Sequence, residues 1–385
     1  MTAFTERWVL KMKDDKINLE ELSYHKIACI KTLELRNRYS RLNGKNSVRG
    51  EHGYGDNFLI KEILTDQGAR GWGLYLDSYD KEKDGMLIGR RVSDVFQFET
   101  GILGQEHFAY DFALHDLAGC ILNVPVYRML GGSEPPIVHC YDGVILMDDI
   151  SPDIEPGGLS RILEECKADY ELGYRDFKIK IGRAPKWMDW KKGLKEDIEV
   201  TTMIRDHYPD AKIMVDANSV YTMEKMKQYI NATADCKLYW IEEPFVENYK
   251  EDLELKEYIN DKSPGTMIAD GEANPQLEKL LPMAEKGVID VLQMDIASFG
   301  FTNWRKLLPK LQEHQIKISP HNWGLKIKTH YTANLAASYS YIPTIEGIID
   351  ETEGVDFSGY HLNQGRITIP DKAGFGMELI WGKEI

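Results

Sequence analysis

Residues 171–185 read ELGYRDFKIKIGRAP, and this stretch contains the pattern that decides the fold. Three apolar residues alternate with Lys178 and Lys180, which is the period of a β-strand. Side chains two residues apart lie on the same face of a strand, so both lysines point the same way. Burying an ammonium group costs free energy unless an opposite charge compensates it. The pattern therefore predicts a buried strand that carries two cations toward one place.

Similar short apolar runs recur along the chain, beginning with IVHCYDG at 137–143. The centres of the later runs lie 25 to 35 residues apart, at Ile179, Met214, Ile241, Ile268, Gln293, Ile318 and Ile345. Amphipathic stretches such as LEKLLPMAEKGV (277–288) and WRKLLPKLQEHQ (304–315) separate them. Eight regular strand–helix units predict a closed (β/α)8 TIM barrel. An open doubly wound sheet would also alternate, but no GxGxxG motif follows an early strand.

The chain before the barrel pattern has a different distribution of apolar residues. Residues 1 to about 131 show no single period: FLIKEILTDQGARGWGLYL (58–76) reads as two strands, and helical spacing follows from 92 to 129. The glycines and prolines of LGGSEPP (130–136) mark a boundary. We therefore expect a separate α+β unit ahead of the barrel.

Composition excludes several classes of function. The chain has 385 residues, a formal net charge of −15 and a pI of about 5.2, so we expect no binding to nucleic acid or to anionic membranes. The first residues are charged throughout, and no apolar run has the length of a signal peptide or a membrane span. The cysteines are scattered, odd in number and without CxxC spacing, which predicts reduced thiols in a cytoplasmic protein: Cys29, Cys120, Cys140, Cys166 and Cys236.

Polar side chains end nearly every predicted strand, and in a barrel these ends meet on one face. Asp216, Glu242 and Glu272 follow three successive strands. Three carboxylates around one point repel one another unless a cation lies between them. Oxygen ligands suit Mg²⁺, so we expect one Mg²⁺ in the site. For any single acid, pairing with a helix N-terminus or an arginine stays an alternative.

Two candidate acid/base groups face these carboxylates. Neighbouring positive charge and partial burial are expected to lower the pKa of the strand lysines, so that a neutral amine can act as a base. Solvated lysines on an edge strand are the alternative, although a closed barrel has no edge. Asp295 and His321 end the next strands across the barrel. An aspartate that accepts one imidazole N–H fixes the tautomer and raises the basicity of the histidine.

Six motifs in this order resemble the enolase superfamily, specifically its mandelate racemase subgroup: FKIKIG (177–182), VDAN (215–218), WIEEP (240–244), ADGE (269–272), QMD (293–295) and SPHNWG (319–324). HDLAGCILNVPVYRMLGG (115–132) is similar to the capping domain of that family. The resemblance implies a modified TIM barrel over 132–359. It also implies an α+β capping domain over 1–131, which the tail 360–385 rejoins.

The resemblance also implies roles for the strand-end residues. It matches Asp216, Glu242 and Glu272 to the Mg²⁺ ligands, Lys180 to the lysine base, Asp295 and His321 to the dyad, Lys178 to a contact with the substrate carboxylate, and Glu346 to the acid that ends the eighth strand. Asn218, Glu243 and Asp270 lie beside these ligands as supporting groups, and Trp323 follows the histidine as a candidate pocket wall.

The segment RLNGKNSVRGEHGYGDNF (41–58) is expected to contact the distal part of the substrate through Arg49, His52 and Tyr54. Its glycines permit a mobile lid, and an ordinary surface loop is the alternative. Arg183, in the segment GRAPKWMDW that follows the lysine strand, is a further candidate for the site.

The resemblance implies removal of a proton α to a carboxylate through an ene-diolate, which is the reaction of that family. Dehydration of a sugar acid (an aldonate or aldarate) to a 2-keto-3-deoxy acid is the favoured outcome. A racemase, epimerase or cycloisomerase would use the same first half-reaction. A Schiff-base aldolase and a non-catalytic sugar-acid binder are alternatives from other classes. We expect a small sugar-acid substrate and, as is common in the family, a homo-oligomer.

Overall fold

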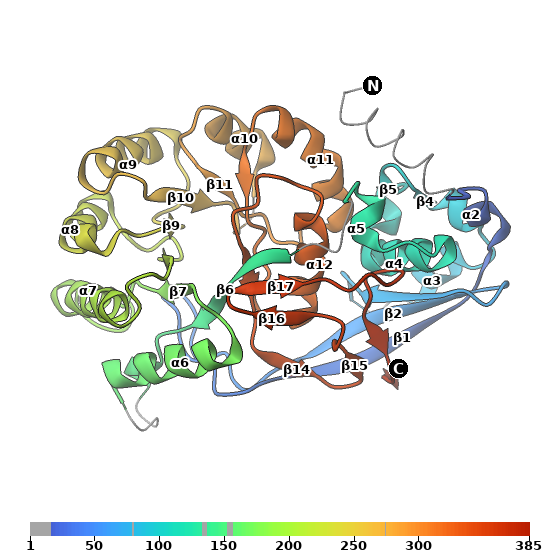
Figure 1. Cartoon of the computed structure of the whole chain (residues 1–385), viewed down its shortest axis with the longest axis horizontal. Helices are drawn as coiled ribbons and strands as arrows, with labels where there is room; N and C mark the ends of the chain where they lie inside the picture. The colour runs from blue at the N-terminus through green and yellow to red at the C-terminus, as the bar shows by residue number, and fades with distance from the viewer. Residues whose placement is uncertain (1–16, 79–80, 133–136, 152–156, 274) are drawn as a thin grey trace.

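The structure is a computed structural model that describes residues 17–78, 81–132, 137–151, 157–273 and 275–385 (Figure 1). Within these residues, no helix is both long enough and apolar enough to cross a membrane.

A barrel of parallel strands forms the larger part of the molecule. Among the described residues its eight strands are β6 (Ile137–Ile145), β7 (Phe177–Lys180), β8 (Ile213–Asp216), β9 (Trp240–Glu242), β10 (Met267–Asp270), β11 (Val291–Leu292), β12 (Lys317–Ile318) and β13 (Ile345–Gly347). Neighbours from β6 to β12 pair in order and in parallel, and β13 pairs in parallel with β6. The hydroxyl of Ser319 donates to the carbonyl of Thr344 at 2.9 Å beside β12 and β13. The predicted barrel is confirmed.

Helices alternate with these strands and cover the outside of the barrel (Figure 1). They are α6 (Leu159–Leu172), α7 (Trp190–His207), α8 (Met223–Thr233), α9 (Tyr249–Lys262), α10 (Leu277–Glu285), α11 (Phe301–Glu313) and α12 (Lys326–Ala336), with the short 3-10 helices η3 (Asp148–Ile150) and η4 (Ala234–Cys236). Side-chain oxygens of Asp189, Thr222 and Asn248 accept N–H groups at the starts of α7, α8 and α9, which explains where these helices begin.

The last barrel strand differs from the predicted pattern of eight strand–helix units. Residues 348–385 are all described, and they form strands β14 to β19 with no helix. These strands are β14 (Asp350–Thr352), β15 (Val355–Asp356), β16 (His361–Asn363), β17 (Arg366–Thr368), β18 (Glu378–Leu379) and β19 (Lys383–Glu384). β14 and β19 pair with the long N-terminal strand, whereas β17 pairs with β6. The tail therefore contacts both parts of the molecule.

The N-terminal part is an antiparallel sheet covered by helices. Its strands are β1 (Ile27–Tyr39), β2 (Asn57–Thr65) and β3 (Arg70–Leu74), followed by the small pair β4 (Phe96–Gln97) and β5 (Gly101–Ile102). Its helices are α2 (Glu21–Tyr24), α3 (Lys81–Leu87), η1 (Val92–Asp94), η2 (Gln105–Tyr110), α4 (Asp111–Leu122) and α5 (Val126–Met129). A Cβ on Gly71 would lie 2.3 Å from the Leu117 Cα, so glycine lets α4 approach the sheet closely.

Hydrogen bonds hold this capping part against the ends of the barrel strands. Asn37 Nδ2 and the Tyr39 hydroxyl, both on β1, donate to the carbonyl of Gly324 at 2.8 and 2.9 Å. The backbone N–H of Leu74 donates to the hydroxyl of Tyr331 on α12 at 3.1 Å. The loops of the capping part are thereby brought over the strand ends that carry the predicted site. The exact domain boundaries remain a prediction.

Candidate active site

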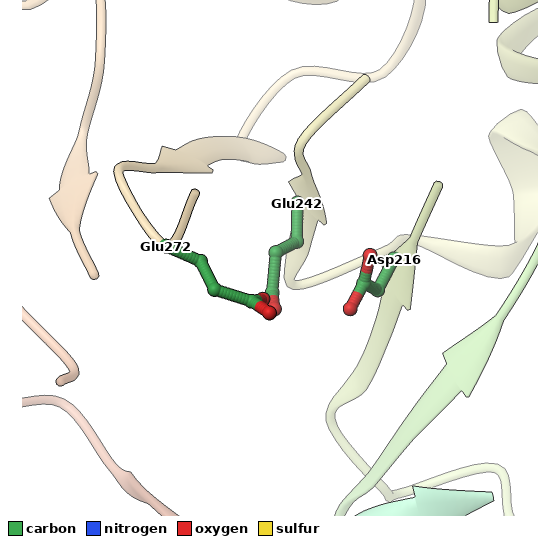
Figure 2. A group of neighbouring side chains, drawn as sticks. All are labelled: Asp216, Glu242 and Glu272. Atoms are coloured by element: carbon green, nitrogen blue, oxygen red, sulfur yellow. The ribbon is translucent and has the colours of Figure 1, made fainter. Parts of the chain in front are cut away.

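Strand register brings the three predicted carboxylates together. Asp216 pairs with Lys180 on one side and with Glu242 on the other, while Glu272 follows β10 by two residues. One oxygen from each of Asp216, Glu242 and Glu272 lies within 4.8 Å of the others, and Figure 2 shows all three carboxylates converging on one space. Asp216 and Glu242 are fully buried, and Glu272 Oε2 is a buried oxygen without a hydrogen-bond partner in the described part of the chain. An oxygen-only set with a free ligand atom fits a hard divalent cation such as Mg²⁺.

Both strand lysines point at these carboxylates. Lys178 Nζ lies 2.6 Å from Glu242 Oε1, 2.8 Å from Glu346 Oε1 and 3.7 Å from Asp216 Oδ2. Lys180 forms an ion pair with Asp216. The lysines therefore share a face, as the strand period predicts.

Among the protein groups alone, the surrounding carboxylates raise the pKa of both lysines, which is opposite to the expected lowering. Burial disfavours the ammonium of Lys178, but Glu242 and Glu346 outweigh burial and raise its pKa well above the usual value. The pKa of Lys180 is raised as well, because Asp216 outweighs burial and the nearby Lys178. Asp216 is also buried, yet the two ammonium groups hold its pKa at about 2. The carboxylates around the lysines therefore outweigh the neighbouring positive charge that the strand pattern contains.

Two side chains that the sequence did not single out hold Glu242 in place. Its Oε2 accepts a hydrogen bond from Trp240 Nε1 at 3.0 Å and another from Gln293 Nε2 at 2.8 Å. Gln293 is the centre of a predicted strand and the first residue of the QMD motif, and a polar residue in an otherwise apolar run is the signal that points to it. Glu346 is oriented differently, since its Oε2 accepts the backbone N–H of Asn322 at 2.9 Å.

Asp295 and His321 form a hydrogen-bonded pair. His321 Nδ1 lies 2.9 Å from Asp295 Oδ2, and because a carboxylate accepts, Nδ1 carries the proton. His321 Nε2 lies 3.2 Å from Glu272 Oε1, so the ring faces the carboxylate triad. Burial lowers the pKa of His321, but Glu272, Glu346 and Asp295 outweigh burial and raise it.

A cavity of about 400 Å³ opens above these groups. From the barrel it is lined by Lys180, Glu272, His321, Leu146, Trp323, Gly324 and Leu325, and from the capping part by Tyr39, Asn46, Arg49, His52, Asp56 and Phe58. The His52 and Trp323 rings pack edge to face, with their centroids 4.5 Å apart. Tyr54 is 67% exposed and does not belong to this lining. Lys178 lies outside the lining too, because its side chain is buried among carboxylates.

The predicted supporting residues Asn218, Glu243 and Asp270 form hydrogen bonds in the loops that carry the three carboxylates. Asn218 donates its N–H to Asp216 Oδ1 at 2.9 Å. Glu243 Oε2 accepts from Asn218 Nδ2 at 3.5 Å and its Oε1 accepts the N–H of Ala273 at 3.3 Å, while burial and neighbouring acids raise its pKa to about 9. Asp270 Oδ1 accepts the N–H of Gly271 at 2.6 Å.

Arg183 does not reach the cavity. Its buried guanidinium forms ion pairs with Asp149 at 2.7 Å and with Asp197 at 2.6 Å, which tie the loop after β7 to η3 and α7. The interpretation of Arg183 as a site residue is therefore wrong.

Residues 46–47, in the segment whose glycines permit a mobile lid, are hydrogen-bonded to the barrel. Trp187 Nε1 donates to the carbonyl of Asn46 at 2.8 Å, and the Ser47 hydroxyl donates to the carbonyl of Ala217 at 3.0 Å. The side chain of Asn46 in turn accepts the N–H of Arg49 at 2.6 Å. The backbone that carries Arg49 is therefore held against the barrel by these hydrogen bonds.

Comparison with known proteins identifies the family. The model of the enolase C-terminal domain-like family matches residues 161–383, which is more than half of the chain. This chain belongs to the enolase superfamily. The predicted family and the predicted barrel with a capping part are confirmed.

Solved structures of superfamily members share the fold of this chain over most of its length. Galacturonate dehydratase from Geobacillus sp., complexed with D-galacturonate and 5-keto-4-deoxy-D-galacturonate, is 32% identical with a TM-score of 0.87, over 93% of this chain and 95% of that chain. A mandelate racemase/muconate lactonizing protein from Geobacillus sp., complexed with magnesium and tartrate, is 31% identical with a TM-score of 0.87, over 93% of each chain. D-galactarolactone cycloisomerase of Agrobacterium fabrum is 25% identical, over 83% of this chain and 88% of that protein. These similarities support an enzyme with a magnesium cofactor.

Proposed function

We propose that this enolase-superfamily enzyme removes the proton α to the carboxylate of a sugar acid and then eliminates water to give a 2-keto-3-deoxy acid. The observation that carries the proposal is the shared cavity. Lys180 and His321 line it together with Glu272. Lys180 contacts Asp216 of the triad, and His321 contacts Glu272. A substrate in this cavity would contact two acid/base groups.

The carboxylate triad fits the predicted cofactor. Asp216, Glu242 and Glu272 would hold one Mg²⁺, whose positive charge, when bound, stabilises negative charge that develops on the substrate carboxylate. Lys178 holds Glu242 and Glu346 in fixed positions through its ion pairs. The assignment of Lys178 as a direct contact to the substrate stays a prediction.

The protein groups then move two protons. One of Lys180 and His321 takes the α-proton, so the C–H bond breaks and its electron pair forms a carbon–carbon double bond. The other gives a proton to the β-hydroxyl, whose C–O bond breaks as water leaves. The resulting enol becomes the 2-keto group by proton transfer from solvent. His321 Nε2 and Lys180 Nζ both line the cavity. Lys180 would donate a proton as an ammonium and accept one only as a neutral amine, and His321 would accept a proton at Nε2 when its ring is neutral.

The lining of the cavity supports a polyhydroxylated anion as substrate. Asn46, Arg49, His52 and Asp56 contribute polar or charged side chains from the capping part. The similar galacturonate dehydratase makes D-galacturonate the first candidate. The similar D-galactarolactone cycloisomerase favours an isomerase as the second candidate function, which would use the same α-proton step.

A panel of sugar acids, with D-galacturonate first, tests the proposal. The protein is incubated with each acid and MgCl₂, and 2-keto-3-deoxy products are detected with semicarbazide. We expect a product that disappears with EDTA and in Lys180→Ala and His321→Ala. His314→Ala removes a histidine at the solvent-facing end of α11 and is the matched control that keeps activity. Turnover that survives EDTA would contradict the proposal, and a substrate adduct trapped by borohydride would indicate a Schiff-base aldolase instead.

A further inference from the structure

Lys328 is a buried lysine on α12 that the proposed reaction does not use. Lys328 is 8% exposed. Its Nζ lies 2.6 Å from Asp295 Oδ2 and 3.0 Å from the carbonyl oxygen of Trp323. It therefore joins the end of β11 to the loop after β12, and this loop carries His321. The strand pattern gives no sign of it, because a helix residue ten positions after the end of β12 follows no strand period.

A lysine at this position is costly for two reasons. Burial of an ammonium group is unfavourable unless it is paired. Lys328 is also the third residue of α12 (Lys326–Ala336), and positive charge is unfavourable in the first turn of a helix, where the helix dipole is itself positive. A methionine could fill the same space without either penalty. The ammonium is therefore explained better by what it holds than by packing.

Asp295 is the group that Lys328 holds. Asp295 Oδ1 accepts the backbone N–H groups of Ala297 and Ser298, each at 2.8 Å. Asp295 Oδ2 accepts from both His321 Nδ1 and Lys328 Nζ. Burial opposes the charge of Asp295, but Lys328 first and His321 second outweigh burial and lower the pKa of Asp295. The ammonium thus contacts the same oxygen of Asp295 that accepts from the histidine, while the backbone holds the other oxygen.

We propose that Lys328 is a positioning residue for the Asp295–His321 pair. Its ammonium fixes the Asp295 carboxylate in the orientation that accepts the Nδ1 proton, so that Nε2 of His321 faces Glu272 and the cavity. The same ammonium holds the carbonyl of Trp323, whose ring forms part of the cavity wall. This inference rests on the proposed function, in which His321 is one of the two proton-transfer groups.

The first test compares partial reactions of variants. Lys328→Met removes the charge at similar length, and Lys328→Arg keeps it. Lys326→Met is the matched control, since Lys326 Nζ donates to the Asp350 carbonyl at 2.7 Å. For an accepted sugar acid, α-proton exchange in D₂O and water elimination are measured separately. Lys328→Met should impair the same step as His321→Asn, with kcat about 10- to 100-fold lower and KM within about 3-fold. Lys328→Arg should recover part of kcat, and Lys326→Met should behave as the wild type.

Other outcomes overturn the inference. Equal losses in the Lys180 and His321 steps would show a general structural role, and a loss below about 3-fold would show no role in catalysis.

A second measurement does not require turnover, so it separates this inference from the proposed function. With Mg²⁺ present and the rings neutral, ¹⁵N NMR of histidine-labelled protein reports which ring nitrogen carries the proton, and His321→Asn assigns the signal. We expect one tautomer, with Nδ1–H, in the wild type and a mixture in Lys328→Met. An unchanged tautomer in Lys328→Met overturns the inference, whether or not any sugar acid reacts.

Discussion

Replacing Lys178 by methionine should destabilise the barrel strongly. The side chain of Lys178 is 1% exposed, and those of its three partners Asp216, Glu242 and Glu346 are fully buried. The substitution leaves three buried carboxylates without their shared cation. Removing one partner of a buried ion pair typically costs about 3 to 5 kcal/mol. We expect a loss of this size in the free energy of unfolding, with the carboxylates taking up protons to limit it.

The assay is urea denaturation followed by tryptophan fluorescence, in EDTA so that no bound cation can replace the ammonium. Lys192→Met is the matched control, because Lys192 pairs with Glu196 at 3.6 Å and its side chain is 62% exposed. An exposed pair of this kind contributes about 0 to 1 kcal/mol. Adding Glu346→Gln to Lys178→Met should restore part of the loss, with a coupling of at least about 1 kcal/mol. A loss below about 1 kcal/mol for Lys178→Met would refute the reasoning.

Three further predictions follow from the geometry. His321→Asn should lower turnover of the accepted sugar acid at least about 100-fold in the semicarbazide assay, because it removes an acid/base group, and near-normal turnover would exclude that role. Burial raises the pKa of Asp252 from 3.8 to about 7, so the folded state binds the extra proton between these values and stability falls as pH rises from about 4 to 7. Asp252→Asn should flatten this dependence in thermal unfolding, and an unchanged slope would contradict the prediction. Trp187→Phe removes the hydrogen bond to Asn46, so trypsin should cleave after Arg49 several-fold faster, as measured by mass spectrometry, and an unchanged rate would show that the turn is anchored elsewhere.

The barrel and its candidate site could be predicted because the site residues recur at the same place in each unit, at or just after the end of a strand. Each candidate ligand or acid/base group follows a short apolar run, and parallel strands bring these ends to one face. The register of Lys180, Asp216 and Glu242 on adjacent strands follows directly from that pattern. A local sequence pattern thus carried information about groups that are far apart in the chain.

Other features depend on distances that no local pattern contains. Lys328 reaches Asp295 from a helix, and Trp187 reaches Asn46 across two parts of the molecule. The pKa of each lysine among the protein groups depends, in the same way, on how many carboxylates lie within a few ångströms of its ammonium. The strand–helix period also does not show that no helix follows β13, where the chain instead forms β14 and pairs with β1.

The central claim is that this site removes a proton α to a carboxylate. Proton NMR in D₂O measures this directly: D-galacturonate and the other sugar acids are incubated with the protein and Mg²⁺, and loss of the α-proton signal is followed. We predict exchange or elimination for at least one acid, abolished by EDTA, restored by added Mg²⁺, and abolished in the Lys180→Ala, His321→Asn double variant. Loss of the α-proton signal that persists in EDTA or in that double variant would contradict the account.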